Sequence, residues 1–110
     1  MKIIKSKGDF TKAEIFNMTQ GTVAKVSDHV GEVLELSGWV LYEDEDKDGK
    51  PQSVLAIKEI NGQVSATISR PFIEQFFKML EFMGDEEFNV KVIGATSKNN
   101  REYIICEAVQ

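Results

Sequence analysis

Four residues of one acidic segment follow the spacing of a calcium-binding loop. Asp44, Asp46, Asp48 and Gly49 reproduce the first half of the pattern in which alternate carboxylates converge on one hard cation. The twelfth position of such a loop carries a bidentate glutamate, but here it is Leu55, which the strand pattern directs to the core. The flanking segments also read as strands and not as helices. We therefore favour a solvated hairpin tip, and we expect no metal and no other cofactor.

Nucleophilic chemistry would depend on His29 and Cys106, the only histidine and the only cysteine. Nothing in the sequence brings these two residues together. Cys106 lies in an apolar segment, which favours a small packed side chain, and a single cysteine excludes an internal disulfide. We expect no enzyme. The alternative, a small metal-dependent hydrolase, would require the carboxylates of residues 43–48 to hold a metal.

Trp39 is better suited to binding than to catalysis. It falls on the mixed face of a strand, together with Glu35 and Ser37. An exposed aromatic ring on a sheet can stack on a nucleic-acid base, which contributes about 1–3 kcal/mol per base. The alternative is a bend at Gly38 that exchanges the two faces of the strand and turns Trp39 into the core.

Basic and amide side chains accompany this tryptophan. Lys58, Thr67 and Lys91 fall on outward strand positions and would form a weakly basic floor for a nucleic-acid backbone. The loop before the last strand adds further basic and amide groups, and an aromatic residue follows on the same strand face. The candidate DNA-binding residues are therefore Trp39, Lys58, Thr67, Lys91, Lys98, Asn99, Arg101 and Tyr103.

Hydrophobic periodicity predicts the elements that position these residues. Residues 1–8 read as a polar, basic arm, and a short helix with Thr11 as its cap and Glu14 in a capping box follows within 9–20. Three strands with period-two patterning come next, and a second helix begins after Ser69 and ends at Gly84. The predicted strands are a first one from Glu32 to about Tyr42, then 52–59, 63–68, 87–95 and 101–109.

This order of elements, β-β-β-α-β-β, is the order of an OB fold. We therefore predict a mainly β structure, a five-stranded OB-like barrel with a short N-terminal helical extension. The 110 residues, 42% of them hydrophobic, suffice for a single domain with one modest core. Its basic arm and helical extension would occupy residues 1–31 and its barrel residues 32–110.

The charge balance argues against a broad cationic surface. The net charge is −5, but the acidity is concentrated, because residues 26–50 contain eight acidic residues against two lysines. A local basic face is therefore compatible with an acidic protein. No apolar run approaches the roughly 20 residues of a membrane span. The N-terminal lysines precede no apolar segment of a secretory signal, so we expect a cytoplasmic protein.

Four segments together resemble a known family. They are residues 38–44 with the Asp48-Gly49 turn, 54–57, 69–73 and 94–103, the last being the most distinctive because a Thr-Ser-Lys turn precedes an arginine and an aromatic residue. Across most of the chain the sequence is similar to small single-stranded-DNA-binding proteins encoded by phages and prophages of Gram-positive bacteria. The resemblance implies an OB-like barrel.

The same resemblance implies binding of single-stranded DNA with little sequence preference, in support of phage DNA replication or recombination. Its partners would be single-stranded DNA and phage or host replication proteins. A homo-oligomer, formed through residues 1–8 and the first helix, would add binding area. The alternative is a phage accessory module that binds a host or replication protein and uses the barrel only as a scaffold.

Overall fold

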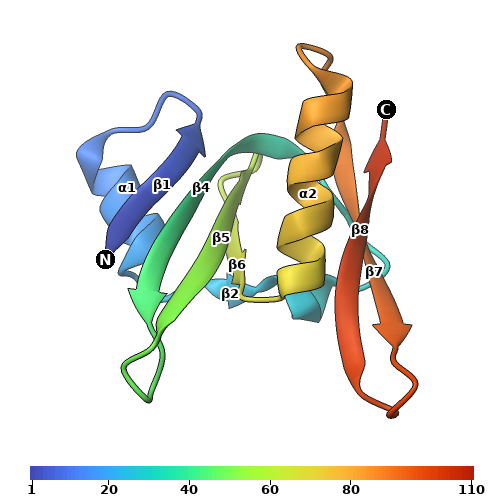
Figure 1. The fold of residues 1–110 in the computed structure, drawn as a ribbon. Helices are drawn as coiled ribbons and strands as arrows, with labels where there is room; N and C mark the ends of the chain where they lie inside the picture. Colours follow the sequence, from blue (N-terminus) through green and yellow to red (C-terminus); the bar gives the residue numbers. More distant parts are fainter.

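The computed structural model describes residues 1–110 and contains eight β-strands, two α-helices and one short 3-10 helix (Figure 1). The mainly β class predicted from the sequence is confirmed. In chain order the elements are β1 (Lys2–Lys7), α1 (Lys12–Thr19), β2 (Ala24–Lys25), η1 (Val26–His29), β3 (Val33–Leu34), β4 (Leu36–Glu45), β5 (Pro51–Glu59), β6 (Val64–Thr67), α2 (Arg70–Met83), β7 (Asn89–Thr96) and β8 (Glu102–Val109).

The strands form two separate sheets. One sheet has the order β1-β4-β5-β6-β2, and the other has the order β3-β7-β8. Because β3 and β4 follow each other almost directly, one stretch of chain passes from the second sheet into the first. The predicted closed barrel is not seen, since β6 and β8 do not pair and both sheets remain open. Helix α2 lies between the two sheets (Figure 1).

The N-terminal segment is a strand and not the polar arm that the composition predicts. β1 pairs antiparallel with β4 and forms an edge of the five-stranded sheet, although all six of its residues are exposed. An edge strand gains backbone hydrogen bonds without burying its side chains, so hydrophobic patterning gives no sign of it. Its lysines are typical of edge strands, where charge discourages pairing with another chain.

Gly38 exchanges the two faces of β4, as the second interpretation of Trp39 anticipates. The register between β4 and β5 shifts between Leu36 and Gly38. On either side of this bulge Leu36 and Trp39 contact the same core cluster, although their odd spacing would place them on opposite faces of a regular strand. Val40 and Tyr42 consequently face the other way, toward α1.

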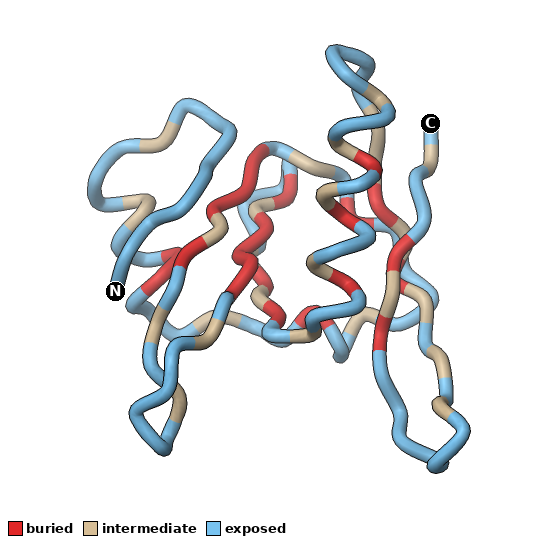
Figure 2. Tube along the Cα trace, viewed as in Figure 1, coloured by how far each residue is buried: buried red, intermediate tan, exposed pale blue.

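Two hydrophobic clusters result, one on each face of β4 and β5 (Figure 2). The main core lies between α2 and the two sheets and includes Leu55 and Ile57 of β5. The smaller cluster lies under α1 and includes Val54 and Ala56, which the alternating pattern places outward. That prediction is wrong because α1 covers the face that a single-sided sheet would show to water.

Both helices begin and end as their caps predict. The N–H of Glu14 donates to the Thr11 hydroxyl at 3.1 Å, and the N–H of Thr11 donates back to the Glu14 carboxylate at 3.2 Å. In α2 the Ser69 hydroxyl accepts from the N–H of Phe72 at 3.4 Å, and Gly84 ends the helix with a φ of 61°. Neither helix is long and apolar enough to cross a membrane.

Candidate nucleic-acid interface

A groove of about 700 Å³ opens where β6 and β8 fail to pair, and we call it the seam groove. It follows the end of β6 and the start of α2 on one side, and the paired ends of β7 and β8 on the other. Its lining combines polar and apolar side chains and includes Ser27, Val30, Thr67, Ile68, Ser69, Pro71, Thr96, Glu102, Tyr103 and Ile104. The unpaired edges of the two sheets thus leave an opening beside the N-terminus of α2.

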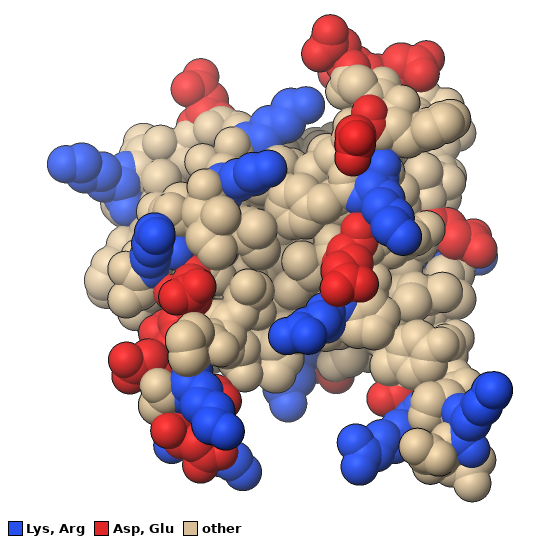
Figure 3. Space-filling model, in the orientation of Figure 1, with Lys and Arg blue, Asp and Glu red and all other residues tan.

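Two hairpins project at the same end of the molecule as this opening (Figure 1). The β4–β5 hairpin and the β7–β8 hairpin stand apart, with a hollow between their tips (Figure 3). A smaller groove of about 460 Å³ lies beside the β4–β5 hairpin and includes Arg70 of α2. Ile68 lines both grooves, so the two grooves lie next to each other at the start of α2.

The tip of the β7–β8 hairpin is a tight, well-defined turn. The N–H of Ser97 donates to the carbonyl of Arg101 at 2.8 Å, and the N–H of Arg101 donates to the Ser97 hydroxyl at 3.2 Å. Asn100 closes the turn with a φ of 58°, in the left-handed region that asparagine tolerates. These bonds leave Lys98, Asn99 and Arg101 exposed, and basic side chains stand out at this tip in Figure 3.

Tyr103 carries the aromatic surface of the seam groove. It follows the hairpin tip on β8, pairs in register with Ala95 of β7, and is 38% exposed. Thr67 lies across the groove, where its hydroxyl accepts a hydrogen bond from the N–H of Ser69 at 3.0 Å. Two of the eight predicted residues, Thr67 and Tyr103, therefore line the seam groove, and three more, Lys98, Asn99 and Arg101, lie exposed at the tip of the β7–β8 hairpin.

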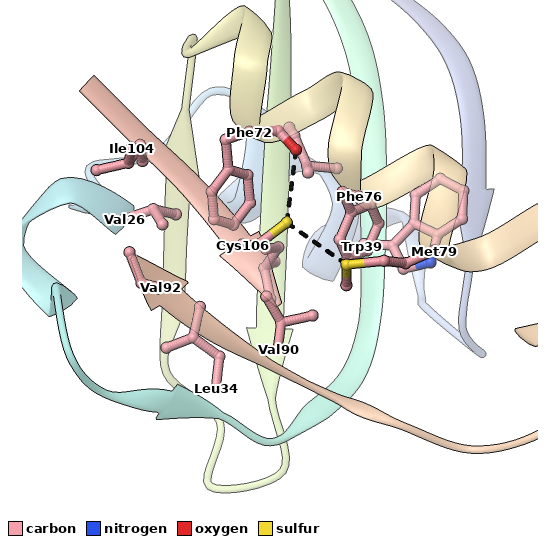
Figure 4. Packing of buried hydrophobic residues seen from close by; sticks show 12 residues of the cluster. Val26, Leu34, Trp39, Phe72, Phe76, Met79, Val90, Val92, Ile104 and Cys106 are labelled. Carbon is pink, nitrogen blue, oxygen red and sulfur yellow. Dashed lines mark hydrogen bonds between the residues drawn. The ribbon is translucent and has the colours of Figure 1, made fainter. Parts of the chain in front are cut away.

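Trp39 does not belong to this group. It is 7% exposed and lies in the main core beside Phe76 (Figure 4). Its ring meets the rings of Phe76 and Phe77 edge to face, with centroid distances of 5.8 and 5.1 Å. The prediction that Trp39 stands exposed as a stacking platform is therefore wrong. The bulge at Gly38 turns its side chain toward α2 instead of toward water.

Two predicted lysines also lie elsewhere. The Lys58 ammonium is 2.6 Å from the Glu14 carboxylate and 5.7 Å from the centroid of the Phe10 ring, so it serves the contact between β5 and α1. The sequence places Lys58 in the basic floor of a nucleic-acid site, whereas in the structure its ammonium pairs with Glu14 of α1. Lys91 pairs in register with Val33 and Glu107 in the three-stranded sheet and does not line the seam groove.

Two residues that line these grooves are not among the predicted DNA-binding residues. Ile68, at the end of the predicted strand 63–68, is 59% exposed because β6 ends at Thr67 and the chain turns into α2. Arg70, the first residue of α2, is exposed and lines the groove beside the β4–β5 hairpin. The exposure of Ile68 and Arg70 depends on where β6 ends. The segment Ile68-Ser69-Arg70-Pro71 indicates only that a helix begins there.

The acidic hairpin tip has an internal structural role. One carboxylate oxygen of Asp46 accepts hydrogen bonds from the backbone N–H groups of Asp48 and Lys50, at 2.8 and 3.0 Å. Leu55, at the twelfth position of the calcium pattern, is fully buried in the main core. No three histidine, cysteine, aspartate or glutamate side chains come together in a way that would hold a metal ion.

His29 and Cys106 remain apart from each other and from the grooves. The His29 ring nitrogen lies 3.3 Å from the Glu32 carboxylate at the surface. Cys106 is 1% exposed, and burial raises the pKa of its thiol to about 12. A thiol with such a pKa is protonated at neutral pH and is a poor nucleophile.

No protein-family model, no curated protein and no solved structure matches this chain. The geometry of the grooves and the charges around them are therefore the basis for a functional assignment. The seam groove has the exposed ring of Tyr103 in its lining, and the groove beside it includes Arg70.

Proposed function

We propose that the protein binds single-stranded DNA with little sequence preference, in the seam groove, and so supports phage DNA replication or recombination. The observation that carries the proposal is the exposed ring of Tyr103 in a groove flanked by the basic tip of the β7–β8 hairpin. Stacking on an aromatic ring is tolerant of sequence because every base has a π face. Lys98 and Arg101 supply the positive charge that phosphates require.

The strand's path follows from the charges of the two hairpins. The β4–β5 tip is predominantly acidic and repels phosphates, whereas the β7–β8 tip offers Lys98 and Arg101 without an ion-pair partner. We therefore expect the nucleic-acid backbone to run along β7–β8, with bases directed into the groove over Tyr103 and Ile68. Arg70 would hold the strand where it crosses the start of α2.

We also infer that the two sheets are an opened form of the OB barrel. β3 and β4 together serve both sheets, as the long first strand of an OB barrel does. Helix α2 falls between the third and fourth strands of that scheme, β6 and β7. The hairpins β4–β5 and β7–β8 then correspond to the two loops with which OB folds bind oligonucleotides.

Fluorescence anisotropy with a labelled oligothymidine of about 16 nucleotides, the upper site size of one OB module, tests the proposal. We expect Tyr103→Ala to weaken binding by roughly 5- to 150-fold, the equivalent of one lost base stack. The double variant Lys98→Ala/Arg101→Ala should weaken binding and make the dependence on salt shallower. Each lost phosphate contact reduces the slope by about 0.7 for a single strand.

A matched control removes two lysines from the other hairpin. Lys47→Ala/Lys50→Ala has the same change in net charge and lies at the same end of the molecule, but on the acidic tip. It should weaken binding less than Lys98→Ala/Arg101→Ala. The proposal would be contradicted if oligothymidine did not bind at low salt, or if Tyr103→Ala bound it as tightly as the wild type does.

A further inference from the structure

A second groove, of about 260 Å³, lies at the other end of α2, and we call it the helix-end groove. Its walls come from the end of β1, the first residues of β4, the residue after β5, the last turns of α2 and the segment before β7. Its apolar lining residues are Leu36, Trp39, Ile60, Leu80 and Phe88. Lys7, Glu86 and Glu87 stand among them as the charged lining residues. Apolar walls with a few charged groups are typical of ligand sites.

Trp39 leaves an unsatisfied donor at this groove. Its indole N–H is buried and has no hydrogen-bond acceptor in the protein, although the residue is 7% exposed and lines the groove. Folded proteins satisfy the great majority of buried polar groups, and an unpaired one costs about 1–3 kcal/mol. The residue with this unpaired donor lines the groove, where its ring adds to the apolar walls.

An exposed isoleucine forms the rim of the groove. Ile60 follows β5 and is 68% exposed, whereas Leu36, Leu80 and Phe88 are partly buried against the main core. The apolar surface of the core therefore continues outward to Ile60. A single large apolar side chain seated here would cover surface that water now contacts.

The charges beside the groove favour a cationic ligand. Glu81, Asp85, Glu86 and Glu87 follow one another around the C-terminal end of α2, and none of them forms an ion pair. Figure 3 shows acidic side chains gathered at this upper end of α2. A helix C-terminus carries partial negative charge, so carboxylates there are unfavourable for the helix itself. A positively charged ligand would therefore be attracted to this end of α2.

We propose that the helix-end groove binds a peptide segment of another protein in which a large apolar side chain stands next to lysine or arginine. The apolar side chain packs between Ile60 and Leu80, and its basic neighbour pairs with Glu86 and Glu87. This site lies at the opposite end of α2 from the seam groove, so one chain binds DNA at one end and a protein at the other (Figure 1).

The probe is a short peptide that alternates lysine and leucine, titrated by calorimetry and followed by the fluorescence of Trp39, the only tryptophan. Binding should change the emission of Trp39, since this residue lines the groove. A lysine–serine peptide should bind more weakly because it lacks the apolar side chain. A glutamate–leucine peptide should bind more weakly because it lacks the basic side chain. Failure of the lysine–leucine peptide to bind would overturn the proposal.

Two variants locate the binding. Glu86→Gln/Glu87→Gln should raise the Kd by roughly 3- to 30-fold, as expected for two exposed ion pairs. The matched control Asp44→Asn/Asp48→Asn removes the same charge at the other end of the molecule and should leave the Kd unchanged. An equal loss of peptide affinity in both double variants would mean that the peptide is attracted by the net charge alone. That result would overturn the proposal that it binds in this groove.

An apolar pair of variants completes the test. Ile60→Ser should raise the Kd about fivefold or more, as expected when part of an isoleucine side chain no longer becomes buried. Phe82→Ser removes a side chain that is 89% exposed on the same helix but does not line the groove. If Phe82 matters and Ile60 does not, the groove is not the site. Oligothymidine affinity should be unchanged in Ile60→Ser and Phe82→Ser and should not fall in the two charge variants, which keeps this test separate from that of the seam groove.

Discussion

The Ser69 hydroxyl donates a hydrogen bond to the carbonyl oxygen of Ile104, with 3.1 Å between the two oxygens. The same hydroxyl accepts from the N–H of Phe72 and caps α2. One side chain therefore starts the helix and joins it to β8 across the opening where β6 and β8 do not pair. Both Ser69 and Ile104 line the seam groove, so this bond spans the groove.

Ser69→Ala should lower the free energy of unfolding by about 2 kcal/mol. Loss of a helix cap costs about 1 kcal/mol, and loss of the bond to Ile104 costs about as much again. Urea unfolding measures the change, and Thr11→Ala is the control because Thr11 caps α1 and bonds to no other element. If Ser69→Ala costs no more than Thr11→Ala, the bond across the seam contributes nothing.

Gly38→Ala should destabilise the protein by about 1–3 kcal/mol, the usual cost of overpacking. A Cβ at Gly38 would meet the ring of Phe10 and would lie 2.5 Å from the carbonyl oxygen of Lys7. Gly94→Ala is a milder control, since its Cβ would meet only a Val30 methyl group at 3.2 Å. Truncating Phe10 in the Gly38→Ala background should not restore stability, because the backbone of β1 remains in the way. If stability were restored in this double variant, the steric clash would come from the Phe10 ring alone.

The elements of this fold could be predicted, whereas their partners could not. Capping residues and periodicity are local, which is why α1, α2 and the later strands appear close to their predicted positions. Pairing is not local. Nothing in the segment 2–7 indicates that β4 will accept it as an edge strand, and nothing near Val54 indicates that α1 will cover that face. Closure of the barrel fails for the same reason, since it depends on two strands far apart in the sequence.

Glu14 should titrate below its ordinary value because of Lys58. The hydrogen bond from the Lys58 ammonium, followed by that from the N–H of Thr11, lowers the pKa of the Glu14 carboxyl from 4.5. A lowered pKa in the folded state adds stability above the unfolded pKa, and this stability is lost as the pH falls through the folded pKa. The difference in stability between wild type and Glu14→Gln should therefore shrink on acidification below about pH 4.5.

Lys58→Met provides the control for this titration. It removes the first cause of the shift and leaves the capping bond to Thr11 in place. Nuclear magnetic resonance of the Glu14 carboxyl should then show a pKa higher than in the wild type. An unchanged pKa would mean that Lys58 does not reach Glu14 in solution.

The site shows the same division between local and distant information. The tip at residues 97–101 is a short turn whose exposed residues follow from its own sequence, so Lys98, Asn99 and Arg101 lie where they are expected. The positions of Trp39 and Lys58 depend on which side of the sheet α2 and α1 dock. No local pattern carries that information, and both residues therefore serve packing instead of the groove.

The Cys106 thiol should make the protein less stable in alkali. Burial raises the pKa of this thiol from 9.0 to about 12. Between these values the unfolded chain has released its thiol proton and the folded chain has kept it, so unfolding is favoured by up to about 1.4 kcal/mol per pH unit. Above pH 9 the free energy of unfolding, measured in urea, should therefore fall less steeply with pH in Cys106→Ala than in the wild type. Tyr42→Phe is the companion variant, since burial also raises the pKa of Tyr42. Parallel declines in wild type and Cys106→Ala would mean that the thiol ionises without unfolding.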